Sequence, residues 1–479
     1  MIKDKQKFYV TSSIAYANAK PHIGYAMELI QADTLARYYA QLGADSFFLT
    51  GTDEHGQKLL EAAKNNNQDV QNYVDELSAT FLDLAKELGL RNDKFVRTTD
   101  ISHKKAAQKL WQACSEDIYK SDYSGMYCVG HEAFLKESDL VDGLCPDHKT
   151  KPENIELESY FFKLSKYADR LKQAIITGEL RIVPQKRRNE MLAFLEKGLD
   201  DVSVSRPKSQ LEWGVEVPDD PSHVMYVWFD ALSNYISAIG YGDNQNEFDK
   251  YWPADVHVIG KDIARFHCLL WPAMLLSAGL AMPKSVYVHG FITSDGQKMS
   301  KSLGNVIGPI EYLETYGSDA LRYYLLRYIP SYNDGDFTKQ RFDEVYSADL
   351  ANNLGNLVSR LAAMINKYNG GNYQTTSVDG LDLDDYMERF QFDRALEDIF
   401  SRLTDLNVAI DEHKPWELFK SEPEKTIEVL SAMICELLEI NKSLAAFLPE
   451  TAAKITAIFK DNKASEGSTI LFPRLEDVS

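Results

Sequence analysis

Hydrophobic and polar positions follow two different periods in the first part of the chain. Short apolar runs at Phe8 to Ile14 and at Asp45 to Thr50 are each followed by a longer segment whose apolar residues recur every three or four positions, over Ile23 to Gln41 and Val70 to Leu88. The short runs are typical of buried strands and the longer segments of amphipathic helices. This alternation predicts a parallel β-sheet within residues 1–114.

The pattern changes after residue 114. Residues 115–224 are mixed and loop-rich, apart from the strand-like run Tyr160-Phe161-Phe162. Strand patterns then resume over three runs, which are Val224 to Phe229, Val256 to Ile259 and Tyr287 to Thr293. We therefore expect an α/β fold in which a doubly wound parallel sheet, built from residues 1–114 and 225–293, is split by a connective insertion at 115–224. Such a sheet binds ligands at the carboxyl ends of its strands.

The C-terminal part of the chain is helical in pattern. Apolar residues keep three- and four-residue spacing through Leu350 to Ile365, Phe390 to Leu406 and Ile427 to Leu448. Gly370-Gly371-Asn372 and Ser421-Glu422-Pro423 are the clearest breakers and mark turns between helices. We expect an α-helical bundle domain over 347–479, joined to the sheet by a loop and contact region at 294–346.

Composition narrows the class of protein. The chain has 479 residues, of which 44% are apolar and 26% charged, which suits a soluble globular protein of roughly three domains. No apolar run approaches the roughly 20 residues of a membrane span, and Met1 to Lys7 lacks the apolar core of a signal peptide. We expect a cytoplasmic protein with no membrane partner. The formal net charge of −20 argues against broad, nonspecific binding of nucleic acid, so any such partner needs local basic patches.

One candidate phosphate site lies at the first strand-to-helix junction. Pro21-His22-Ile23-Gly24-Tyr25 connects the first strand to the first long helix. The start of a helix offers unpaired backbone N–H groups and the positive end of its dipole, both of which attract phosphate. Gly24 lets a nucleotide approach the backbone, and His22 can donate from a ring nitrogen to phosphate oxygens. The structural alternative is a histidine that only caps the helix.

A second candidate is the pentapeptide Lys298-Met299-Ser300-Lys301-Ser302, which follows a turn at Gly296. Two lysines and two hydroxyls on one short loop are suited to clamp a polyanion. Ammonium groups that close on a triphosphate stabilise the transition state more than the ground state. We interpret the two segments together as an ATP site, with His22, Gly24, Lys298 and Lys301 as its catalytic residues. A solvated basic turn is the alternative for the second segment.

The five cysteines do not form a disulfide framework in a chain of this length. Cys114, Cys268 and Cys435 lie in helical patterns and are interpreted as core thiols. The other two begin short Cys-x-x-His turns separated by 13 residues, so that the candidate ligands are Cys128, His131, Cys145 and His148. Two such turns predict a closed tetrahedral site for structural zinc in the insertion. A metal-free hairpin with chance spacing is the alternative.

The two phosphate-site motifs resemble the His-Ile-Gly-His and Lys-Met-Ser-Lys-Ser signatures of the class I aminoacyl-tRNA synthetases. Among these, the chain is most similar to the methionyl-tRNA synthetase family, and the resemblance runs nearly end to end. It is carried further by Phe48 to Gly56, Tyr226 to Ala231, Ile259 to Ile263 and Lys414-Pro415-Trp416. The chain departs from the first signature at its fourth position, where Tyr25 replaces histidine; a phenol can still donate one hydrogen bond.

The resemblance implies three sets of binding residues. The ATP site, with Mg²⁺ bound to the nucleotide, is implied to contain His22, Gly24, Tyr25, Gly260, Asp262, Lys298, Ser300 and Lys301. The methionine site is implied to contain Ile14, Tyr16, Asp53, Trp228, Ala231, Tyr235, Ile263, His267 and Trp271, with Asp53 on the substrate ammonium. The anticodon of methionine tRNA is implied to contact Asn356, Arg360, Pro415 and Trp416. Without the resemblance, the aromatic residues of the second and third sets would be interpreted as core.

The implied activity is that of a methionine–tRNA ligase, which forms methionyl-adenylate from ATP and L-methionine and then charges methionine tRNA, both initiator and elongator. Two observations agree with methionine as the substrate. The segment between the halves of the sheet is too short for the editing insertion of the isoleucine, valine and leucine enzymes. Those enzymes need editing because a binding pocket cannot strongly reject an amino acid that lacks one methylene group. Cysteine enzymes need a thiol ligand at the end of the first strand, where this chain has Ser12 and Ser13.

Two rival functions remain at this stage. One is another class I adenylate-forming enzyme with a different side-chain pocket. The other is a non-catalytic tRNA-binding paralogue, which we would expect to have lost a clamp lysine or Asp53; neither is lost here. Because the sequence stops soon after the expected bundle, at Leu471-Phe472-Pro473-Arg474, a monomer is the simpler expectation.

Overall fold

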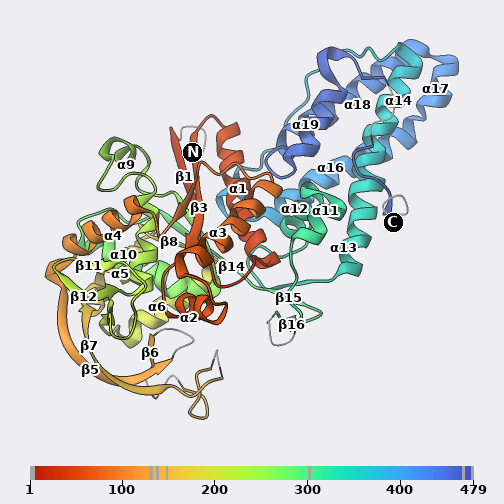
Figure 1. The fold of residues 1–479 in the computed structure, drawn as a ribbon. Coiled ribbons are helices and arrows are strands. Elements are labelled where there is room, and N and C mark those ends of the chain that lie inside the picture. The colour runs from red at the N-terminus through yellow and green to blue at the C-terminus, as the bar shows by residue number, and fades with distance from the viewer. Residues whose placement is uncertain are drawn as a thin grey trace.

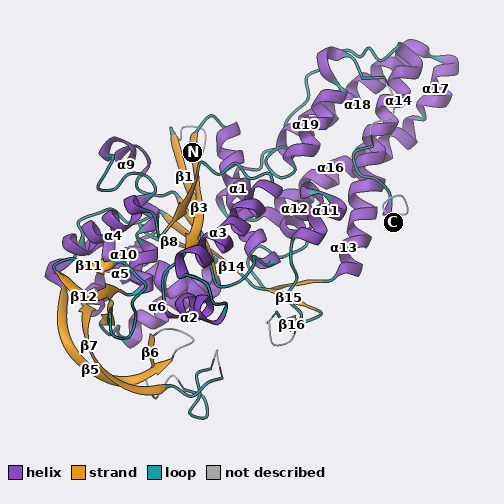
Figure 2. Ribbon diagram, in the orientation of Figure 1, coloured by secondary structure: helices purple, strands orange, loops and turns teal. Residues whose placement is uncertain are grey.

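The computed structural model describes residues 6–128, 133–135, 137, 140–146, 149–299, 304–466 and 470–475. The molecule consists of an α/β body and an elongated arm of helices, which is formed by the C-terminal part of the chain (Figure 1). The named strands lie in the body, in the ribbon beside it and in a small sheet between body and arm, whereas the arm is built from helices and their connections where the structure describes it (Figure 2). The prediction of an α/β fold with a parallel sheet and a helical C-terminal region is confirmed.

A parallel sheet of seven strands forms the centre of the body. Its strands are β1 (Lys7–Ser12), β2 (Ala15–Tyr16), β3 (Asp45–Asp53), β4 (Lys94–Arg97), β8 (Arg181–Val183), β13 (Val256–Gly260) and β14 (Ser285–His289). The strand order is β2-β3-β1-β13-β14-β8, and β4 also pairs with β3. Every pairing in this sheet is parallel. The carboxyl ends of β1, β3, β13 and β14 therefore open at one common edge, as expected for a doubly wound sheet.

Helices cover both faces of this sheet. On one face the core includes residues of α1 (Ile23–Gln41) and α3 (Val70–Glu87). On the other it includes residues of α4 (Ile101–Ala113), α5 (Ala168–Thr177), α6 (Gln185–Lys197), α7 (Val227–Leu232), α8 (Asn234–Ser237), α9 (Gln245–Tyr251) and α10 (Trp271–Ser277). Helix α2 (Gln57–Asn65) packs on α3. Helix α1 packs on β1, β3 and β13 and is covered by α12 (Ser318–Arg327) on its other side. It is therefore buried around most of its circumference, which explains why its sequence is apolar on more than one face.

The insertion is built around a long antiparallel ribbon. Strands β5 (Ile118–Cys128) and β7 (Glu153–Phe162) pair with each other, with β6 (Ala133–Leu135) and β9 (Val202–Ser203) at the two edges. A second small sheet joins β10 (Ser205–Pro207), β11 (Glu216–Val217) and β12 (Asp220–Met225). Strand β8 also lies between residues 115 and 224, yet it pairs with β14 and so completes the main sheet.

One sequence-based prediction in this region is wrong. The run Val224 to Phe229 was expected to be a strand, but β12 ends at Met225 and α7 begins at Val227. The run is short and apolar throughout, so its pattern fits a buried strand and a buried helix equally well. The result places Trp228 on a helix that faces the carboxyl edge of the sheet.

A small sheet between body and arm leads into the second signature, of which Lys298 and Met299 are described. Strands β15 (Ile292–Ser294), β16 (Gln297–Lys298) and β17 (Gly335–Phe337) form this sheet. The helices that follow are α11 (Ile310–Tyr316), α12, α13 (Lys339–Val345), α14 (Asn356–Asn369), α15 (Asp384–Glu388), α16 (Phe392–His413), α17 (Pro415–Ser421), α18 (Pro423–Leu444) and α19 (Pro449–Ile458). A π-helical segment, Tyr346–Gly355, connects α13 to α14. None of the helices in the described part of the chain is long and apolar enough to cross a membrane.

The arm is fastened to the body by a buried arginine. The guanidinium of Arg322 on α12 lies 2.7 Å from a carboxylate oxygen of Asp33 on α1. It also donates to the backbone oxygen of Phe447, in the connection between α18 and α19, over 2.7 Å. Both charged side chains are fully buried. Since the helix that starts at the first signature is bonded through Arg322 to the arm, the two parts form one connected structure.

Candidate functional site

The predicted site residues gather from separate parts of the sequence at the carboxyl edge of the main sheet. Asp53 ends β3 and Gly260 ends β13, while His22 caps the start of α1. His289, which was not among the predicted residues, ends β14. Because these strands are neighbours and parallel, residues more than 200 positions apart in sequence come together.

His22 and Gly24 form one compact unit at the start of α1. His22 is the N-cap residue, and its Nδ1 accepts a hydrogen bond from the backbone N–H of Tyr25 over 3.3 Å. A Cβ atom at position 24 would lie 3.0 Å from the His22 ring, so any other residue would push the ring aside by a few tenths of an ångström. Partial burial of the ring lowers the pKa of His22. The neutral imidazole, with Nδ1 accepting, then carries its proton on Nε2 and can donate it to a ligand.

Tyr25, the departure from the first signature, points into the protein. Its hydroxyl lies 3.1 Å from Oγ1 of Thr50 and 3.4 Å from the backbone oxygen of Gly51, both on β3. Its ring packs edge-on against Phe81. Burial raises the pKa of this phenol, so it stays neutral. In this position the hydroxyl ties α1 to β3, and contact of Tyr25 with ATP stays a prediction.

The chain that follows the second signature lies next to the first signature. The backbone N–H of Ile23, in the first turn of α1, donates to the oxygen of Ile307, just after the signature loop, over 2.9 Å. Lys298 is exposed on β16, with its ammonium 5.5 Å from the centre of the Phe291 ring, a ring also approached by Lys261 at 4.3 Å. Ser300 and Lys301 lie outside the described residues.

Gly260 and Asp262 occupy the turn after β13. A Cβ atom at position 260 would lie 2.7 Å from a carboxylate oxygen of Asp262, so the close approach of the two requires glycine. Asp262 itself is exposed at the site edge. A carboxylate there can accept hydrogen bonds from hydroxyl groups of a bound ligand.

A cluster of aromatic side chains, which includes Trp228, Tyr235, His267 and Trp271, adjoins these residues. Two hydrogen bonds fix the position of His267 within it. The Tyr235 hydroxyl lies 2.7 Å from Nε2 of His267, whose Nδ1 lies 3.0 Å from the backbone oxygen of Ile263. A carbonyl oxygen only accepts, so Nδ1 carries the proton and Nε2 accepts from Tyr235. Burial lowers the pKa of His267 to about 4. The imidazole is therefore neutral at pH 7 and lines the cluster without charge.

Trp228 and Trp271 complete this cluster from two sides. Trp228 stacks on Phe266 with ring centres 3.8 Å apart, and it lies edge-on to His267 at 6.1 Å. Trp271 lies 5.9 Å from Tyr235 and is fully buried. His267 belongs to the π-helical segment Phe266–Leu270, a kind of turn that is frequent at functional sites. Ile14 and Ile263 pack, partly buried, against the same hydrophobic core, and Ala231 belongs to the buried part of α7.

Sequence reasoning missed the polar residues that pack behind this aromatic cluster. His257 on β13 lies 2.8 Å from Oγ1 of Thr11 through Nδ1, and its Nε2 accepts from Nε1 of Trp271 over 3.3 Å. Its ring also packs on Tyr235 with centres 4.2 Å apart. Burial lowers the pKa of His257 well below its ordinary value. A histidine in the otherwise apolar run Val256 to Ile259 was the available signal.

Asp53 lies in the main sheet, on a strand two positions away from β13. It ends β3, where Tyr16 of β2 is its partner in the strand register, and Ala17 donates its backbone N–H to the Asp53 oxygen over 3.0 Å. Two residues further on, Nδ1 of His55 lies 2.6 Å from the buried carboxylate of Asp230 on α7. The chain that follows Asp53 is therefore bonded, through His55 and Asp230, to α7, the helix that carries Trp228 and Ala231.

The predicted metal ligands are only partly described. Cys128 ends β5 and Cys145 lies in the loop that follows β6, and both are buried. A tight turn surrounds Cys145, whose backbone N–H donates to Thr150 and whose oxygen accepts from Lys149. His131 and His148 lie outside the described residues. Among the residues that are described, no group of three or more histidine, cysteine, aspartate or glutamate side chains is placed to hold a metal ion.

The four predicted anticodon residues lie on the arm. Asn356 is the first residue of α14 and is exposed, and Arg360 lies one turn later on the same helix. The Arg360 guanidinium pairs with Asp411 near the end of α16 over 2.6 Å, which brings α14 close to the start of α17. Pro415 opens α17 and is buried, whereas Trp416 is 40% exposed. An indole with this exposure can stack on an unpaired base.

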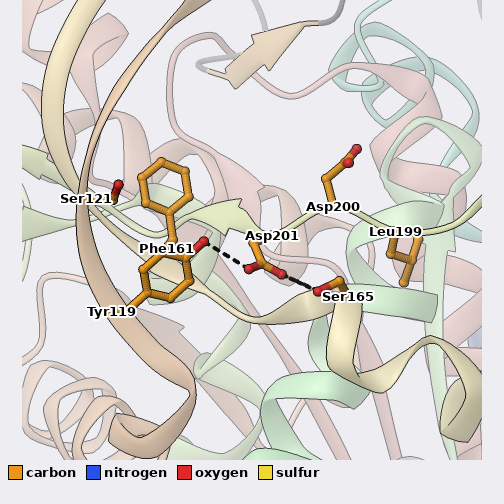
Figure 3. Close-up of a pocket in the computed structure, with 7 residues that line it drawn as sticks. All are labelled: Tyr119, Ser121, Phe161, Ser165, Leu199, Asp200 and Asp201. Carbon is orange, nitrogen blue, oxygen red and sulfur yellow. Dashed lines mark hydrogen bonds between the residues drawn. The ribbon is translucent and has the colours of Figure 1, made fainter.

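A shallow pocket elsewhere is not part of this site. It lies in the insertion, where Tyr119, Phe161 and Leu199 surround Asp201 (Figure 3). The carboxylate of Asp201 accepts from the hydroxyls of Tyr119 over 2.9 Å and Ser165 over 2.6 Å. Its polar groups are thus engaged with one another, and none of the predicted site residues lines it.

Comparison with known proteins gives a consistent result. A family model described as tRNA synthetases class I (M) matches residues 8–154 and 148–362. The chain is 44% identical over 473 residues to a Methionine–tRNA ligase of Thermotoga maritima, which covers 94% of this chain and 74% of the relative. It is 41% identical to the Methionine–tRNA ligase of Bacillus subtilis, over 99% of this chain and 79% of the relative.

Solved structures agree in fold as well as sequence. A methionyl-tRNA synthetase of Mycobacterium tuberculosis in complex with methionyl-adenylate superposes with a TM-score of 0.92 at 36% identity, covering 98% of this chain and 100% of that one. The apo form of the enzyme from the same organism gives a TM-score of 0.84 at 34% identity, covering 98% of each chain.

Proposed function

The chain belongs to the class I tRNA synthetases of the methionine type, the methionine–tRNA ligases, and from this premise we propose which of its residues carry out each step. The family is an ATP-dependent ligase family that joins methionine to tRNA through methionyl-adenylate. The residue roles below are our proposals.

A single observation carries these proposals. The neutral Tyr235–His267 pair and the His22–Gly24 unit lie at the same carboxyl edge of one parallel sheet. An apolar, aromatic pocket beside a phosphate-binding helix start is what an enzyme needs to bring a thioether amino acid next to the α-phosphate of ATP.

In the first step, the methionine carboxylate attacks the α-phosphorus of ATP, and the bond to the β-phosphate breaks to release pyrophosphate. His22 donates from Nε2 to the phosphates at the start of α1, where Gly24 keeps its ring folded back. Gly260 and Asp262 bind the adenosine. Lys298, together with Ser300 and Lys301 of the same motif, binds the departing pyrophosphate. The lysines and the Mg²⁺ bound to the nucleotide would neutralise its charge. Positioning and charge stabilisation supply the rate enhancement, without a covalent enzyme intermediate.

Selection of methionine rests on the uncharged pocket. Asp53 binds the substrate ammonium, and Tyr16 opposite it on β2 limits the depth of that end. The side chain enters between Trp228, Tyr235 and His267, with Ile14, Ala231, Ile263 and Trp271 around it. Because burial keeps His267 neutral, the pocket offers a polarisable thioether one weak polar contact and otherwise apolar walls.

In the second step, a ribose hydroxyl at the 3′ end of methionine tRNA attacks the carbonyl carbon of the mixed anhydride, and AMP leaves. Recognition of the tRNA falls to the arm. Trp416 stacks on an anticodon base, held by Pro415, and Asn356 and Arg360 contact base edges from α14. The exposed pair of Arg360 with Asp411 is weak enough to open for a nucleotide.

For the insertion we propose a structural zinc ion held by Cys128, His131, Cys145 and His148. The two described ligands fit this role, because buried thiols at a strand end and in a tight turn suit zinc coordination. Bound zinc would stabilise the tip of the ribbon formed by β5 and β7 and takes no part in the reaction. Thiols that form no disulfide, in any of the five cysteines, also agree with our proposal of a cytoplasmic enzyme.

ATP–pyrophosphate exchange tests the assignment. We expect exchange with methionine and with none of the other 19 amino acids, and Lys298→Ala and Lys301→Ala should each reduce its rate by about 100-fold or more at unchanged methionine affinity. Lys86→Ala is a matched control, because Lys86 is exposed on α3 and pairs only with Asp83 of the same helix among the described residues. Exchange that is unaffected by the loss of either clamp lysine would contradict the proposed roles.

A further inference from the structure

Glu28, on the inner face of α1, is a buried carboxylate that no step above uses. One of its oxygens, Oε1, accepts the backbone N–H of Ser13 over 2.7 Å and the Ser13 hydroxyl over 2.5 Å. The other, Oε2, lies 3.0 Å from Nε2 of His289 at the end of β14. Glu28 therefore joins the ends of two strands to the helix that carries the first signature.

The hydrogen-bond partners of His289 indicate that both of its ring nitrogens carry a proton. Nδ1 lies 2.8 Å from the backbone oxygen of Gly290, which only accepts, so Nδ1 carries a proton. Nε2 faces the Glu28 carboxylate, so a further proton lies between these two groups. Burial of the ring would lower the pKa of His289, but its hydrogen bond and charge interaction with Glu28 raise that pKa above the ordinary value. The pair is then an imidazolium and a carboxylate.

Other ionisable groups face this pair from the neighbouring elements. Asp262, after β13, raises the pKa of His289, and His22, before α1, has its own pKa lowered in part by His289. Tyr25 on α1 and Tyr235 on α8 are both close enough to Glu28 for its charge to raise their pKa values. These are the residues of the ATP and methionine sites, so the pair lies beneath both.

The chain after His289 transmits its position to the signature loop. Gly290 packs so closely that a Cβ atom there would lie 2.3 Å from the backbone oxygen of Asn333. Strand β15 then begins at Ile292 and pairs with β17, and β16 ends at Lys298. With so little slack in the backbone, a shift of His289 displaces the strands that lead to Lys298.

We propose that Glu28 and His289 are a positioning pair, which sets the spacing between the helix of the first signature and the strand that leads to the second. The inference rests on the proposed function and extends it, because neither residue needs to touch ATP or methionine. Reacting groups that are misplaced by about 1 Å can lose roughly 100-fold in rate, so a bond that fixes the two phosphate-binding halves contributes to kcat.

Removing the bond is the first test. We expect His289→Ala to reduce kcat for methionine-dependent ATP–pyrophosphate exchange by about tenfold or more, with KM for methionine changed by less than about threefold. His223→Ala is the control, because His223 is also a buried histidine but lies in the insertion, where it contacts Ser205. An unchanged kcat in folded His289→Ala would overturn the proposal.

Keeping the bond while removing its charge is the second test. In Glu28→Gln, the amide oxygen can accept from Ser13 while the amide N–H donates to Nε2 of a neutral His289. Protonation of His289 would then leave two donors facing each other, because the Ser13 N–H already requires the oxygen. Without the Glu28 charge, burial lowers the pKa of His289, so the ring stays neutral and the bond persists. We expect kcat within about threefold of that of the parent from pH 8 to pH 5.5, because the spacing of the two signatures is kept.

A loss of kcat of about tenfold or more in folded Glu28→Gln would overturn the proposal that the bond between these side chains positions the two signatures, even if His289→Ala failed to fold. Absence of exchange in the parent would instead contradict the proposed function. In that event the pair is still tested by thermal unfolding, because the melting temperature of Glu28→Gln should fall further below that of the parent as the pH is lowered from 8 to 5.5. A constant difference in melting temperature would contradict the pairing itself.

Discussion

The hydroxyl of Tyr235 donates to Nε2 of His267 over 2.7 Å, and the same imidazole donates from Nδ1 to the backbone oxygen of Ile263. This chain fixes the tautomer and orientation of a buried, uncharged histidine. Removal of the hydroxyl leaves Nε2 without its donor in an apolar pocket.

We predict that Tyr235→Phe raises KM for methionine by about tenfold and lowers the free energy of unfolding by about 1–3 kcal/mol, the cost of an unsatisfied buried polar group. Exchange kinetics and urea denaturation measure the two effects. Tyr373→Phe is the control, because Tyr373 is also buried but donates to Phe459 in the arm. Equal KM values for the Tyr235 and Tyr373 variants would show that the hydroxyl does not position His267 for substrate.

The low pKa of His267 predicts how stability depends on pH. In the folded state the pKa is about 4, whereas it is near 6.5 in the unfolded chain, so between these values only the unfolded state binds the proton. Stability therefore falls as the pH is lowered from 6.5 towards 4, and His267 accounts for about 3 kcal/mol of the loss. Denaturation of the parent and of His267→Gln across this range measures it. The variant should lose less stability than the parent; parallel curves would contradict the assignment.

Arg322 predicts a stability effect at the joint between body and arm. Its guanidinium forms an ion pair with Asp33 on α1 and donates hydrogen bonds to the backbone oxygens of Ala446 and Phe447. Removal leaves a buried carboxylate and two backbone acceptors with fewer partners, so Arg322→Met should destabilise the protein by about 3–5 kcal/mol. Arg394→Met is the control, because Arg394 makes an exposed pair with Glu397, and it should cost less than about 0.5 kcal/mol. Similar urea midpoints for the two variants would count against a structural joint at Arg322.

Trp416 predicts a separation of the two reaction steps. Trp416→Ala should leave ATP–pyrophosphate exchange unchanged and raise KM for methionine tRNA by about tenfold or more, because a stacked base contributes about 1–3 kcal/mol. Trp416→Phe retains a stacking surface and should recover most of the charging efficiency. A loss of exchange activity in Trp416→Ala would mean that this side chain supports the body of the enzyme instead of the tRNA.

Zinc binding is predicted to depend on two of the five cysteines, Cys128 and Cys145. The parent should carry about one zinc ion per chain, and Cys128→Ser or Cys145→Ser should lose it, as measured by elemental analysis of the purified protein. Cys435→Ser is the control, because Cys435 lies on α18 and its sulfur contacts the backbone of Gln374 and Thr376. Zinc that is absent from the parent, or retained by both variants, would contradict the proposed site.

Sequence predicted the features whose determinants are local. The helix expected over Ile23 to Gln41 has those bounds in the structure, because its apolar spacing lies within the segment and its N-cap residue, His22, directly precedes it. The run Val224 to Phe229 was mistaken for a strand since six apolar residues carry no period of their own. Its assignment depends on the packing of Trp228 and Phe229 against distant residues.

The polar bonds beneath the site could not be predicted in this way. Glu28 and His289 are separated by 261 residues, and His55 and Asp230 by 175, so no spacing rule connects them. A charged residue between apolar neighbours in a buried helix, such as Glu28 between Met27 and Leu29, signals that a partner exists. Only the strand order of the sheet identifies that partner, and the order is set by long-range packing.

A crystal structure of the protein with a non-hydrolysable analogue of methionyl-adenylate tests the central claim most directly. We predict that the ligand lies at the carboxyl edge of the main sheet, with its ammonium on Asp53, its thioether between Trp228 and the Tyr235–His267 pair, and its phosphate mimic at His22. A ligand bound elsewhere, or a side chain of the ligand that leaves the Tyr235–His267 pocket empty, would contradict the account.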